Sequence, residues 1–351
     1  MKSLVQVGIV GATGYTGSEL VRLLSQHPRV QITALTSRSE AGKPLTAVLP
    51  HLHGLTLPPL TAYDPDTLAE KCEVVFLAGE TGFAMEHAPE LLERGVKVID
   101  LSADFRLKEP GVFQEWYGKT HTAPHLLNEA LYGLPELTPP AAYASARLIA
   151  NPGCYPTASA LALAPLLQAD LVDSERIVVD AKSGVSGAGR SRVSVDYLFT
   201  ELDENFKAYA VEKHRHTPEM EQTLQGIARR TVRIRFTPHL VPMTRGILAT
   251  AYAPLTQPVA LQDLHALYSA FYANQPFVQV RPLGEFPATR DVYGSNRCDI
   301  GLTIDARTRM AVVISVIDNL VKGAAGQAIQ NLNLLMGWEP TSGLPLAGMA
   351  P

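Results

Sequence analysis

The sequence predicts an α/β protein in which a doubly wound parallel sheet is followed by a second domain of the α+β type. Three observations predict it. A glycine-rich turn joins an apolar strand to a helix within residues 5–35, strands and helices alternate up to residue 150, and strand-like segments dominate from residue 177. A chain of 351 residues, 46% of them hydrophobic, is also long enough to bury two cores.

The first strand–helix–strand unit can be followed along the chain. Val5–Val10 is almost wholly apolar, as expected for a strand that is buried on both faces of a parallel sheet. Gly11–Gly17 follows at once, and a helix is expected over residues 18–25. Pro28 ends that helix, and residues 30–35 form the second strand.

Further strands are expected at residues 74–78 and 96–101, on either side of a helix at 85–94. Residues 42–65, rich in Pro, Leu and His, predict an irregular excursion between the second and third strands. The Pro- and Ala-rich stretch 137–146 is expected to approach a domain junction.

Later segments predict a mixed or antiparallel sheet, because strands there are separated by fewer helices. They are residues 177–181, 232–236, 246–252, 278–280, 299–305 and 310–316. Residues 318–337 are expected to be helical, since Leu320, Ala324, Ala328 and Leu332 recur at about one-turn spacing.

Composition argues against several classes of partner. The formal net charge of −4 predicts no basic face for nucleic acid. No apolar run reaches the roughly 18 residues of a membrane-spanning helix, and the start of the chain lacks the apolar core of a signal peptide. The three cysteines lie far apart, which favours a reducing compartment over a disulfide framework. We therefore expect a cytoplasmic protein.

The glycine turn predicts a dinucleotide site, because glycines let backbone N–H groups approach a pyrophosphate at a helix N-terminus. The GxxGxxG spacing alone is weak evidence, because such glycines can also form a turn that binds no ligand. The strand before this turn and the helix after it favour a dinucleotide site. The candidate cofactor residues of this turn are Gly11, Thr13, Gly14, Tyr15, Thr16 and Gly17.

The end of the second strand predicts the kind of cofactor. NAD sites usually place Asp or Glu there for the ribose 2′-hydroxyl, but this chain has Ser37 and Arg38. A guanidinium forms charge-assisted, forked bonds to a phosphate, so we expect NADP, and Glu40 lies too late to act as the usual acid. The alternative is a solvated turn that carries one Arg.

Cys154 is the candidate nucleophile. It stands between Gly153 and Pro156 at the expected start of a helix over residues 158–168, where N–H groups and the helix dipole favour a thiolate and can stabilise an oxyanion. Cys72 and Cys298 lie in strand-like surroundings and are expected to be buried structural residues.

The acid/base candidates are His214 and His216, which precede a predicted helix start with Thr217 as its N-cap and Pro218 in its first turn. The alternative is a solvated, charged turn. The other close histidine pairs, at 51 and 53 and at 121 and 125, have no third ligand at a matching spacing, so no metal site is expected.

Eight motifs occur in a specific order, although each alone would be unspecific. They are residues 11–20, 100–106, 132–136, 151–157, 183–190, 214–219, 239–243 and 318–324. Together they make the sequence resemble the N-acetyl-gamma-glutamyl-phosphate reductases of arginine biosynthesis over essentially its whole length. No departure is found at the matched catalytic positions.

The resemblance implies an NADP-binding Rossmann domain of residues 1–150 and 318–351, closed by the C-terminal helix. It implies a catalytic, substrate-binding and oligomerisation domain of residues 151–317, in a homodimer or homotetramer. Cys154 would be the nucleophile, His216 or His214 the acid/base, and Asn319 would bond the nicotinamide carboxamide.

The implied reaction is the NADPH-dependent reductive dephosphorylation of N-acetyl-L-glutamyl 5-phosphate to the 5-semialdehyde, through a thioester on the cysteine. A substrate with a phosphate, a carboxylate and an acetamido group needs cations and hydrogen-bond donors, although a surface role stays open for each cation. The candidates are Arg106, Lys182, Ser186, Arg190 and Arg245.

Three alternatives were weighed. An aspartate-semialdehyde dehydrogenase would use the same chemistry, but the motifs at 183–190 and 214–219 speak against it. A reductase of carrier-linked aminoadipyl or glutamyl phosphate would want a cationic groove, which a net charge of −4 mildly disfavours. A non-catalytic NADP-sensing protein would have no need of a nucleophile.

Overall fold

The computed structural model describes residues 4–190 and 194–349; the first residues of the chain, on which the expected localisation partly rests, lie outside them. The chain forms two compact units. The first comprises Met1–Pro152, Gly189–Ser191 and Ala324–Leu344, and the second comprises Gly153–Ala188, Arg192–Gly323 and Pro345–Pro351. This division differs from the predicted one at residues 151–152 and 189–191, which belong to the first unit, and at residues 318–323 and 345–351, which belong to the second.

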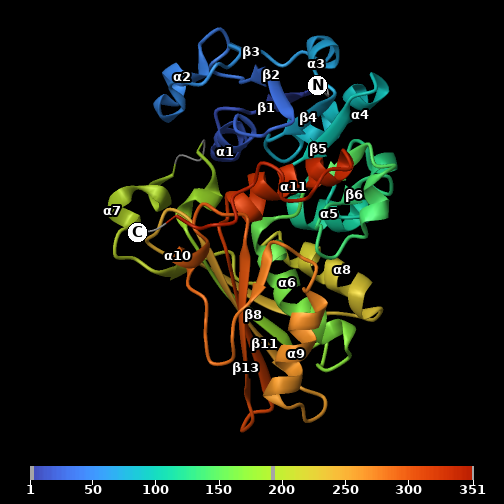
Figure 1. Cartoon of the computed structure of the whole chain (residues 1–351), viewed down its shortest axis with the longest axis vertical. Coiled ribbons are helices and arrows are strands. Elements are labelled where there is room, and N and C mark those ends of the chain that lie inside the picture. Colours follow the sequence, from blue (N-terminus) through green and yellow to red (C-terminus); the bar gives the residue numbers. More distant parts are fainter. Residues whose placement is uncertain (1–3, 191–193, 350–351) are drawn as a thin grey trace. The chain divides into compact units, whose positions relative to one another are not determined.

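The first unit is built on a parallel sheet, as predicted (Figure 1). In the described residues the sheet has seven strands in the order β3-β2-β1-β4-β5-β7-β6, and each pair of neighbours is parallel. The strands are β1 (Val5–Val10), β2 (Val30–Thr36), β3 (Leu60–Thr61), β4 (Val74–Leu77), β5 (Lys97–Asp100), β6 (Leu131–Tyr132) and β7 (Leu148–Ala150). Most of their apolar side chains are buried because helices cover a parallel sheet on both faces.

The principal helices of the first unit are α1 (Tyr15–Leu24), α3 (Pro65–Lys71), α4 (Phe83–Glu93), α5 (Pro110–Tyr117) and α11 (Gly326–Leu335). Helix α11 packs against α1 and β5, so the expected return of the C-terminal helix to the first domain is confirmed. The excursion at 42–65 is less irregular than predicted, since it holds the short α2 (Leu45–Val48), a 3-10 turn and β3, which pairs with β2.

The second unit holds the predicted mixed sheet, which has seven strands within the described residues, in the order β12-β13-β14-β11-β8-β10-β9. The strands are β8 (Ile177–Ser183), β9 (Lys207–Ala208), β10 (Ile234–Leu240), β11 (Ile247–Pro254), β12 (Val278–Val280), β13 (Cys298–Asp305) and β14 (Met310–Ile317). Strands β8 and β10 run parallel, while β11 is antiparallel to both β8 and β14.

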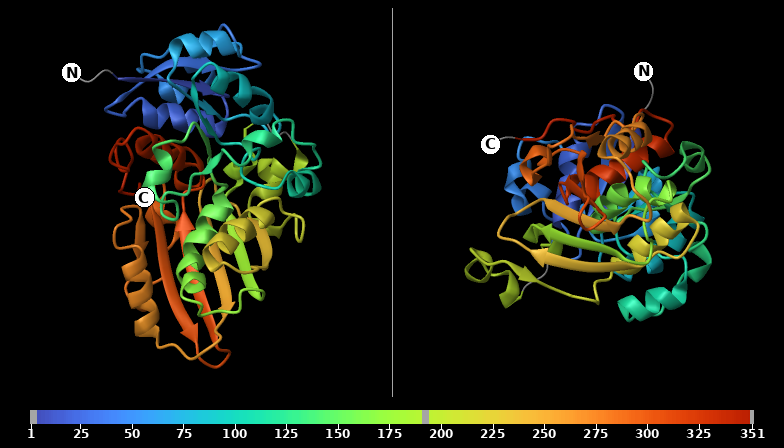
Figure 2. Two further views of the ribbon diagram at one scale, coloured as in Figure 1. Left: turned by 90° about the vertical axis from the view of Figure 1, so that its right-hand side faces the viewer. Right: turned by 90° about the horizontal axis from the view of Figure 1, so that it is seen from below.

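The two faces of this sheet differ. Helices α6 (Cys154–Gln168), α8 (Thr217–Ala228) and α9 (Leu261–Phe271) lie together on one side of it (Figures 1 and 2). The side chains on that face are buried, and the Ser315 hydroxyl donates to the carbonyl of Ala158 in α6. Alternation turns the intervening residues to the other face, where they are only half-buried. That face carries Val178, Leu248, Tyr252, Val312 and Ile314.

The helix expected over residues 318–337 is interrupted. A π-helical turn, Val321–Ala325, precedes α11, because the Asp318 carboxylate accepts the N–H groups of Leu320 and Val321 and so fixes the entry of the chain. A Cβ added at Gly323 would lie 2.8 Å from the Cβ of Cys154, so only glycine fits there without a shift. The π-turn thus seats backbone directly against the candidate nucleophile.

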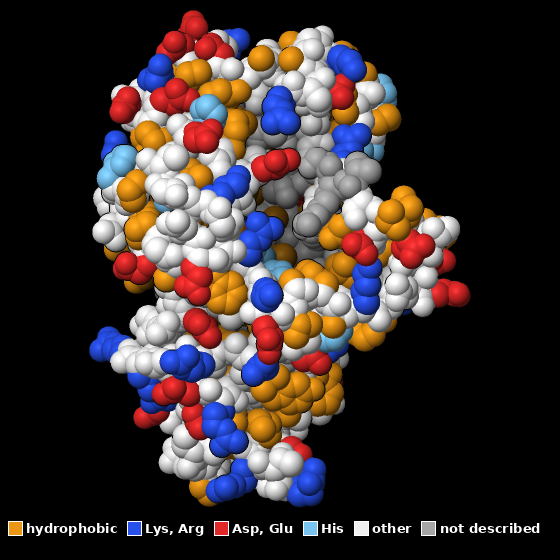
Figure 3. Space-filling model, turned by 180° about the vertical axis from the view of Figure 1, so that it is seen from behind, with side chains coloured by type: hydrophobic (Ala, Val, Ile, Leu, Met, Phe, Trp, Pro, Cys, Tyr) orange, Lys and Arg blue, Asp and Glu red, His pale blue; other side chains and the backbone are white. Residues whose placement is uncertain are grey.

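Surface composition is mixed. On the face drawn in Figure 3, acidic and basic side chains are interspersed, in keeping with the small net charge. Val195, Leu198, Phe199 and Phe206, around the short α7 (Phe199–Leu202), are between 51% and 77% exposed. In the part of the chain that is described, no helix is long and apolar enough to cross a membrane.

Candidate active site

The glycine loop lies between β1 and α1, in the predicted place. Gly11 has a φ of +80°, and the backbone N–H groups of Gly11 and Ala12 donate to the carbonyl of Thr36 at the end of β2. A Cβ at Gly17 would lie 2.2 Å from the Gly11 carbonyl oxygen, so glycine is required for the helix to pack against the loop. Gly14 is the N-cap of α1, and Tyr15 and Thr16 form its first turn.

This loop contacts the end of β2 through a side chain as well. The Thr13 hydroxyl lies 3.1 Å from that of Ser37, which is 4% exposed. Arg38 follows on the surface. Loop N–H groups at a helix N-terminus beside hydroxyls and a guanidinium fit the pyrophosphate and the 2′-phosphate of NADP.

Cys154 lies at the N-terminus of α6, as predicted, but the helix begins at Cys154 itself, with Gly153 as its N-cap, and not at residue 158. Among the cysteines, Cys72 and Cys298 are buried while Cys154 is half-buried. The N–H of Gly153 donates to the Glu219 carboxylate at 2.8 Å. Glu219 is fully buried and belongs to the first turn of α8, so this bond holds the starts of α6 and α8 together.

The histidine pair lies at the start of α8. His216 is the N-cap residue and Thr217 the first helical residue, so the expected N-cap at Thr217 is wrong by one position. No side chain caps this helix at its N-terminus; Pro218, in its first turn, has no N–H to satisfy. The backbone N–H of His216 donates to Nδ1 of His214 at 3.1 Å, so the His214 imidazole is held against the backbone of His216.

Aromatic rings surround His214. Tyr155 and Phe236 lie edge-on to it, with ring centroids 5.3 and 5.2 Å away, and its Nε2 is 3.4 Å from the Tyr209 hydroxyl. Burial, reinforced by the charge of Arg215, lowers the pKa of His214 to about 4. His214 is therefore a neutral imidazole at neutral pH, with Nδ1 as an acceptor.

The predicted substrate cations do not gather in one place. Arg106 is buried in the first unit, where its Nε donates to the Asn151 carbonyl at 2.8 Å and its Nη2 to the Leu101 carbonyl at 2.9 Å. Lys182 pairs with Asp180 at 2.9 Å, and alternation along β8 turns it away from the face that carries Ser183.

Three other candidates meet in the second unit. The Asn319 amide accepts the N–H of Gly246 at 2.7 Å and donates to the Ser186 hydroxyl at 2.9 Å. Arg245 lies 3.6 Å from the buried carboxylate of Asp318. These contacts join the loop after β8 to the start of β11 and the residues after β14. An amide has two donors and two acceptor positions, so the two bonds use half the capacity of Asn319.

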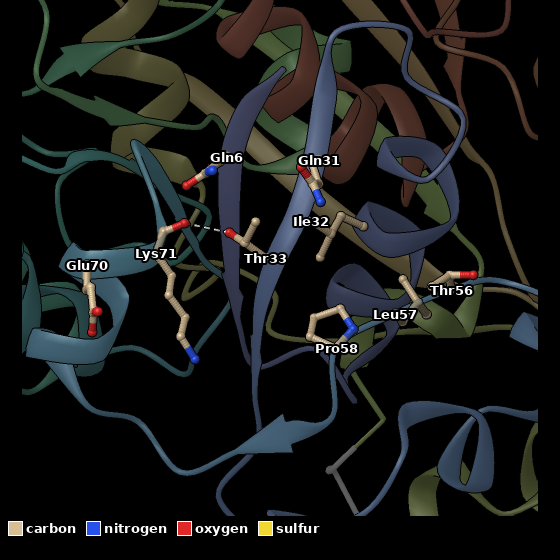
Figure 4. A pocket seen from close by; sticks show the side chains of 9 residues that line it. All are labelled: Gln6, Gln31, Ile32, Thr33, Thr56, Leu57, Pro58, Glu70 and Lys71. Carbon is tan, nitrogen blue, oxygen red and sulfur yellow. Dashed lines mark hydrogen bonds between the residues drawn. The ribbon is translucent and has the colours of Figure 1, made fainter. Parts of the chain in front are cut away.

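Two other features of the described residues concern metal ions and a hollow in the first unit. Within the described residues, no group of three or more His, Cys, Asp or Glu side chains could hold a metal ion. A hollow of about 570 Å³ lies in the first unit between the early residues of β1 and β2, the loop at Thr56–Pro58 and the end of α3 (Figure 4). Ligands of parallel sheets bind at the carboxyl ends of the strands, so this hollow is not the predicted nucleotide site.

The comparisons with known proteins agree with this geometry. Residues 6–145 match the family described as semialdehyde dehydrogenase, NAD binding domain, and residues 154–319 match semialdehyde dehydrogenase, dimerisation domain. The N-acetyl-gamma-glutamyl-phosphate reductase of Symbiobacterium thermophilum is 56% identical over 345 residues, which cover 98% of this chain and 98% of that protein. The chain belongs to the N-acetyl-gamma-glutamyl-phosphate reductase family. The Bacillus subtilis member is 49% identical over 99% of this chain and all of its own length.

Solved structures support the fold. Aspartate semialdehyde dehydrogenase II of Vibrio cholerae superimposes with a TM-score of 0.72 at 20% identity, over 96% of this chain and 99% of that one. The aspartate semialdehyde dehydrogenase of Candida albicans, solved with NADP, gives a TM-score of 0.69 at 17% identity, over 95% of this chain and 99% of that one. The N-acetyl-gamma-glutamyl-phosphate reductase family and these enzymes thus share one fold.

Sequence reasoning missed several residues that shape the site of this N-acetyl-gamma-glutamyl-phosphate reductase family member. Glu219 was included only in the motif at 214–219, yet it binds the backbone before Cys154. Gly323 was part of a motif without a role, yet it packs against Cys154. Tyr155 and Tyr209, whose hydroxyls are 3.0 Å apart, were not singled out. The positions of Glu219 and Gly323 within family motifs were the only signal.

The first unit of this family member also contains an unusual carboxyl group. Asp100, at the end of β5, is fully buried; its Oδ1 accepts the N–H of Ser102 at 2.8 Å, and in the described structure its Oδ2 has no hydrogen-bond partner. Both oxygens of nearby Asp104 instead accept the N–H of Gly82 at the start of α4. Burial, reinforced by the charge of Asp104, raises the pKa of Asp100 to about 7.

We expect Asp100→Asn to change how stability depends on pH. The folded pKa lies above that of the unfolded chain, so this group favours the folded state most at low pH, and that contribution is lost as the pH rises through 7. The free energy of unfolding of the variant, relative to that of the parent, should therefore rise between pH 4 and 7 by up to about 1.4 kcal/mol per pH unit. The difference in melting temperature should rise with it. Thermal melts over that range measure it; a constant difference would contradict it.

Proposed function

We propose that this chain catalyses the NADPH-dependent reductive dephosphorylation of N-acetyl-L-glutamyl 5-phosphate to N-acetyl-L-glutamate 5-semialdehyde, through a thioester on Cys154. The observation that carries the proposal is the joined pair of helix starts: Cys154 opens α6, the histidine pair precedes α8, and the bond from Gly153 to Glu219 links them. A nucleophile and an acid/base group on two helix starts that are held together fit acyl transfer.

The protein's own groups perform the covalent steps. The Cys154 thiolate attacks the acyl carbon, a C–S bond forms, the C–O bond to phosphate breaks, and the departing phosphate takes up a proton. Bound NADPH supplies the hydride that reduces the resulting thioester. Backbone N–H groups at the start of α6 stabilise the oxyanion, and collapse of the thiohemiacetal releases the aldehyde and restores the thiolate.

We assign the acid/base role to His216 and a positioning role to His214. With a pKa of about 4, His214 carries no proton to give at neutral pH, and its two ring nitrogens already face the His216 N–H and the Tyr209 hydroxyl. His216 protonates the thiohemiacetal oxyanion and takes the proton back as the C–S bond breaks.

For the substrate, the contacts favour Arg245 and Ser186 over Lys182, and both lie beside Asn319, for which we keep the role of bonding the nicotinamide carboxamide. The Asn319 amide bonds the Ser186 hydroxyl and the N–H of Gly246, which follows Arg245, and Arg245 pairs with Asp318, which precedes Asn319. These residues therefore lie at one end of the second-unit sheet, where backbone loops offer N–H donors. Lys182 is held by Asp180 on the opposite face. Arg106, buried against two carbonyls, would act by fixing the ends of β5 and β7.

The functional test is the reverse reaction, in which N-acetylglutamate semialdehyde reduces NADP in the presence of phosphate. We expect absorbance at 340 nm to rise only when phosphate is present, because phosphate must cleave the thioester. Aspartate semialdehyde serves as the competing substrate. Turnover with aspartate semialdehyde alone would overturn the proposed substrate, and turnover without phosphate would overturn the acyl-phosphate mechanism.

We further propose a cytoplasmic homodimer or homotetramer. The match to a dimerisation domain and the half-buried apolar face of the second-unit sheet support self-association, since such a face gains by being covered. Cys72, Cys154 and Cys298, all within the described residues, form no disulfide, which fits a reducing compartment. Sedimentation equilibrium at micromolar concentration should give the mass of two or four chains, and a monomer would contradict this assignment.

A further inference from the structure

Arg190 lies far from the glycine loop in sequence but contacts it in the structure. Residues Gly189–Ser191 belong to the first unit, and Nη1 of Arg190 donates to the carbonyl of Thr13 at 2.9 Å. Arg190 is exposed, and this bond uses one of the five N–H donors of a guanidinium. From the sequence, Arg190 is predicted to be one of the substrate cations, because it follows a glycine-rich segment.

Arg190 contacts the carbonyl of Thr13, and the side chain of Thr13 links the glycine loop to the end of β2. The Thr13 hydroxyl lies 3.1 Å from that of Ser37, and the N–H groups of Gly11 and Ala12 donate to the carbonyl of Thr36, the residue before Ser37. Arg190 is therefore anchored at the junction where a dinucleotide fold distinguishes a ribose 2′-hydroxyl from a 2′-phosphate.

The charges around this junction favour an anion. Arg190 contributes, after Lys43, to lowering the pKa of Glu40, which places the guanidinium near that carboxylate. The Glu40 carboxylate is already paired with Lys43 at 2.7 Å, so its charge is largely balanced. Two exposed guanidinium groups then remain near this junction: Arg38 follows Ser37 in the chain, and Arg190 bonds Thr13, whose hydroxyl contacts that of Ser37.

We propose that Arg190 is a specificity-determining residue, which binds the 2′-phosphate of NADP together with Arg38 and Ser37. The inference rests on the proposed function, because it concerns the same cofactor. A forked guanidinium held by a carbonyl loses little further freedom when it binds a phosphate, and its bonds to a phosphate are charge-assisted. NADH lacks that phosphate and gains nothing from this side chain.

The test is nucleotide binding to the purified full chain in the absence of substrate. Fluorescence titration measures the Kd of NADPH and of NADH, and calorimetry measures that of 2′,5′-ADP, which carries the phosphate without nicotinamide. Arg190→Gln should weaken NADPH and 2′,5′-ADP by about 10- to 100-fold and leave NADH within about twofold. Arg190→Lys should restore part of the loss. Arg307→Gln, at a side chain 85% exposed in the second unit, is the matched control.

Each contrary outcome is decisive. An equal loss of NADPH and NADH affinity would place Arg190 at the pyrophosphate and overturn the proposal. Unchanged nucleotide affinity with a raised KM for the acyl phosphate would return Arg190 to the substrate. A parent chain that binds no NADPH would overturn the proposed function itself, whereas a parent that binds it and a variant that does so equally well would overturn only the role of Arg190.

Discussion

We expect Cys154→Ala to lose turnover by about 10⁴-fold or more while it still binds NADPH with the parent affinity. The reason is that Cys154, at the start of α6, is the proposed nucleophile, whereas the glycine loop belongs to the first unit. Steady-state rates and fluorescence titration measure the two properties separately. A parent enzyme incubated with acyl phosphate alone should also gain the mass of the acyl group, and the variant should not.

Cys298→Ala is the matched control. Cys298 is fully buried at the start of β13, so its loss removes packing and lowers the melting temperature, but the rate should stay within about threefold of the parent. Substantial turnover by Cys154→Ala would remove Cys154 from the mechanism. A large rate loss in Cys298→Ala without unfolding would contradict the proposal that Cys298 is structural and Cys154 is the nucleophile.

The second large effect is expected at His216. His216→Asn should lower kcat by about 10²- to 10⁴-fold, because it removes proton transfer to and from the thiohemiacetal oxygen. His214→Gln should lower it less, by about 10-fold, through the lost contact with the His216 N–H. The pH–rate profile discriminates the roles, since the pKa of His214 near 4 keeps it neutral across the working range.

The profile of His214→Gln should therefore keep the shape of the parent profile, while that of His216→Asn loses a limb. Stability supplies an independent check. The folded pKa of His214 lies below its ordinary value, so stability is present above about pH 6.5 and is lost as the pH falls toward 4. His214→Gln should lessen this acid loss. A profile whose limb disappears only in His214→Gln would exchange the two assignments.

Local pattern was sufficient for much of the fold. The apolar strand Val5–Val10, the glycine turn and the helix that follows are specified by neighbouring residues, and the structure has them within a few positions of the prediction. Boundaries that depend on distant contacts were less accurate. The helix expected from residue 318 begins as regular α-helix at Gly326, because Asp318 and the packing of Gly323 on Cys154 impose a π-turn that periodicity does not encode.

The candidate site, like the fold, was predictable from the sequence only in part. The sequence by itself determined the proposed roles, since a cysteine at a helix start, a histidine pair before another helix and Ser-Arg after β2 are local patterns with direct physical meaning. Only the tertiary structure decided which groups meet. Gly153 and Glu219 are 66 positions apart, and Thr13 and Arg190 are 177 apart. Such pairings arise from the packing of whole elements, and no spacing along the chain records them.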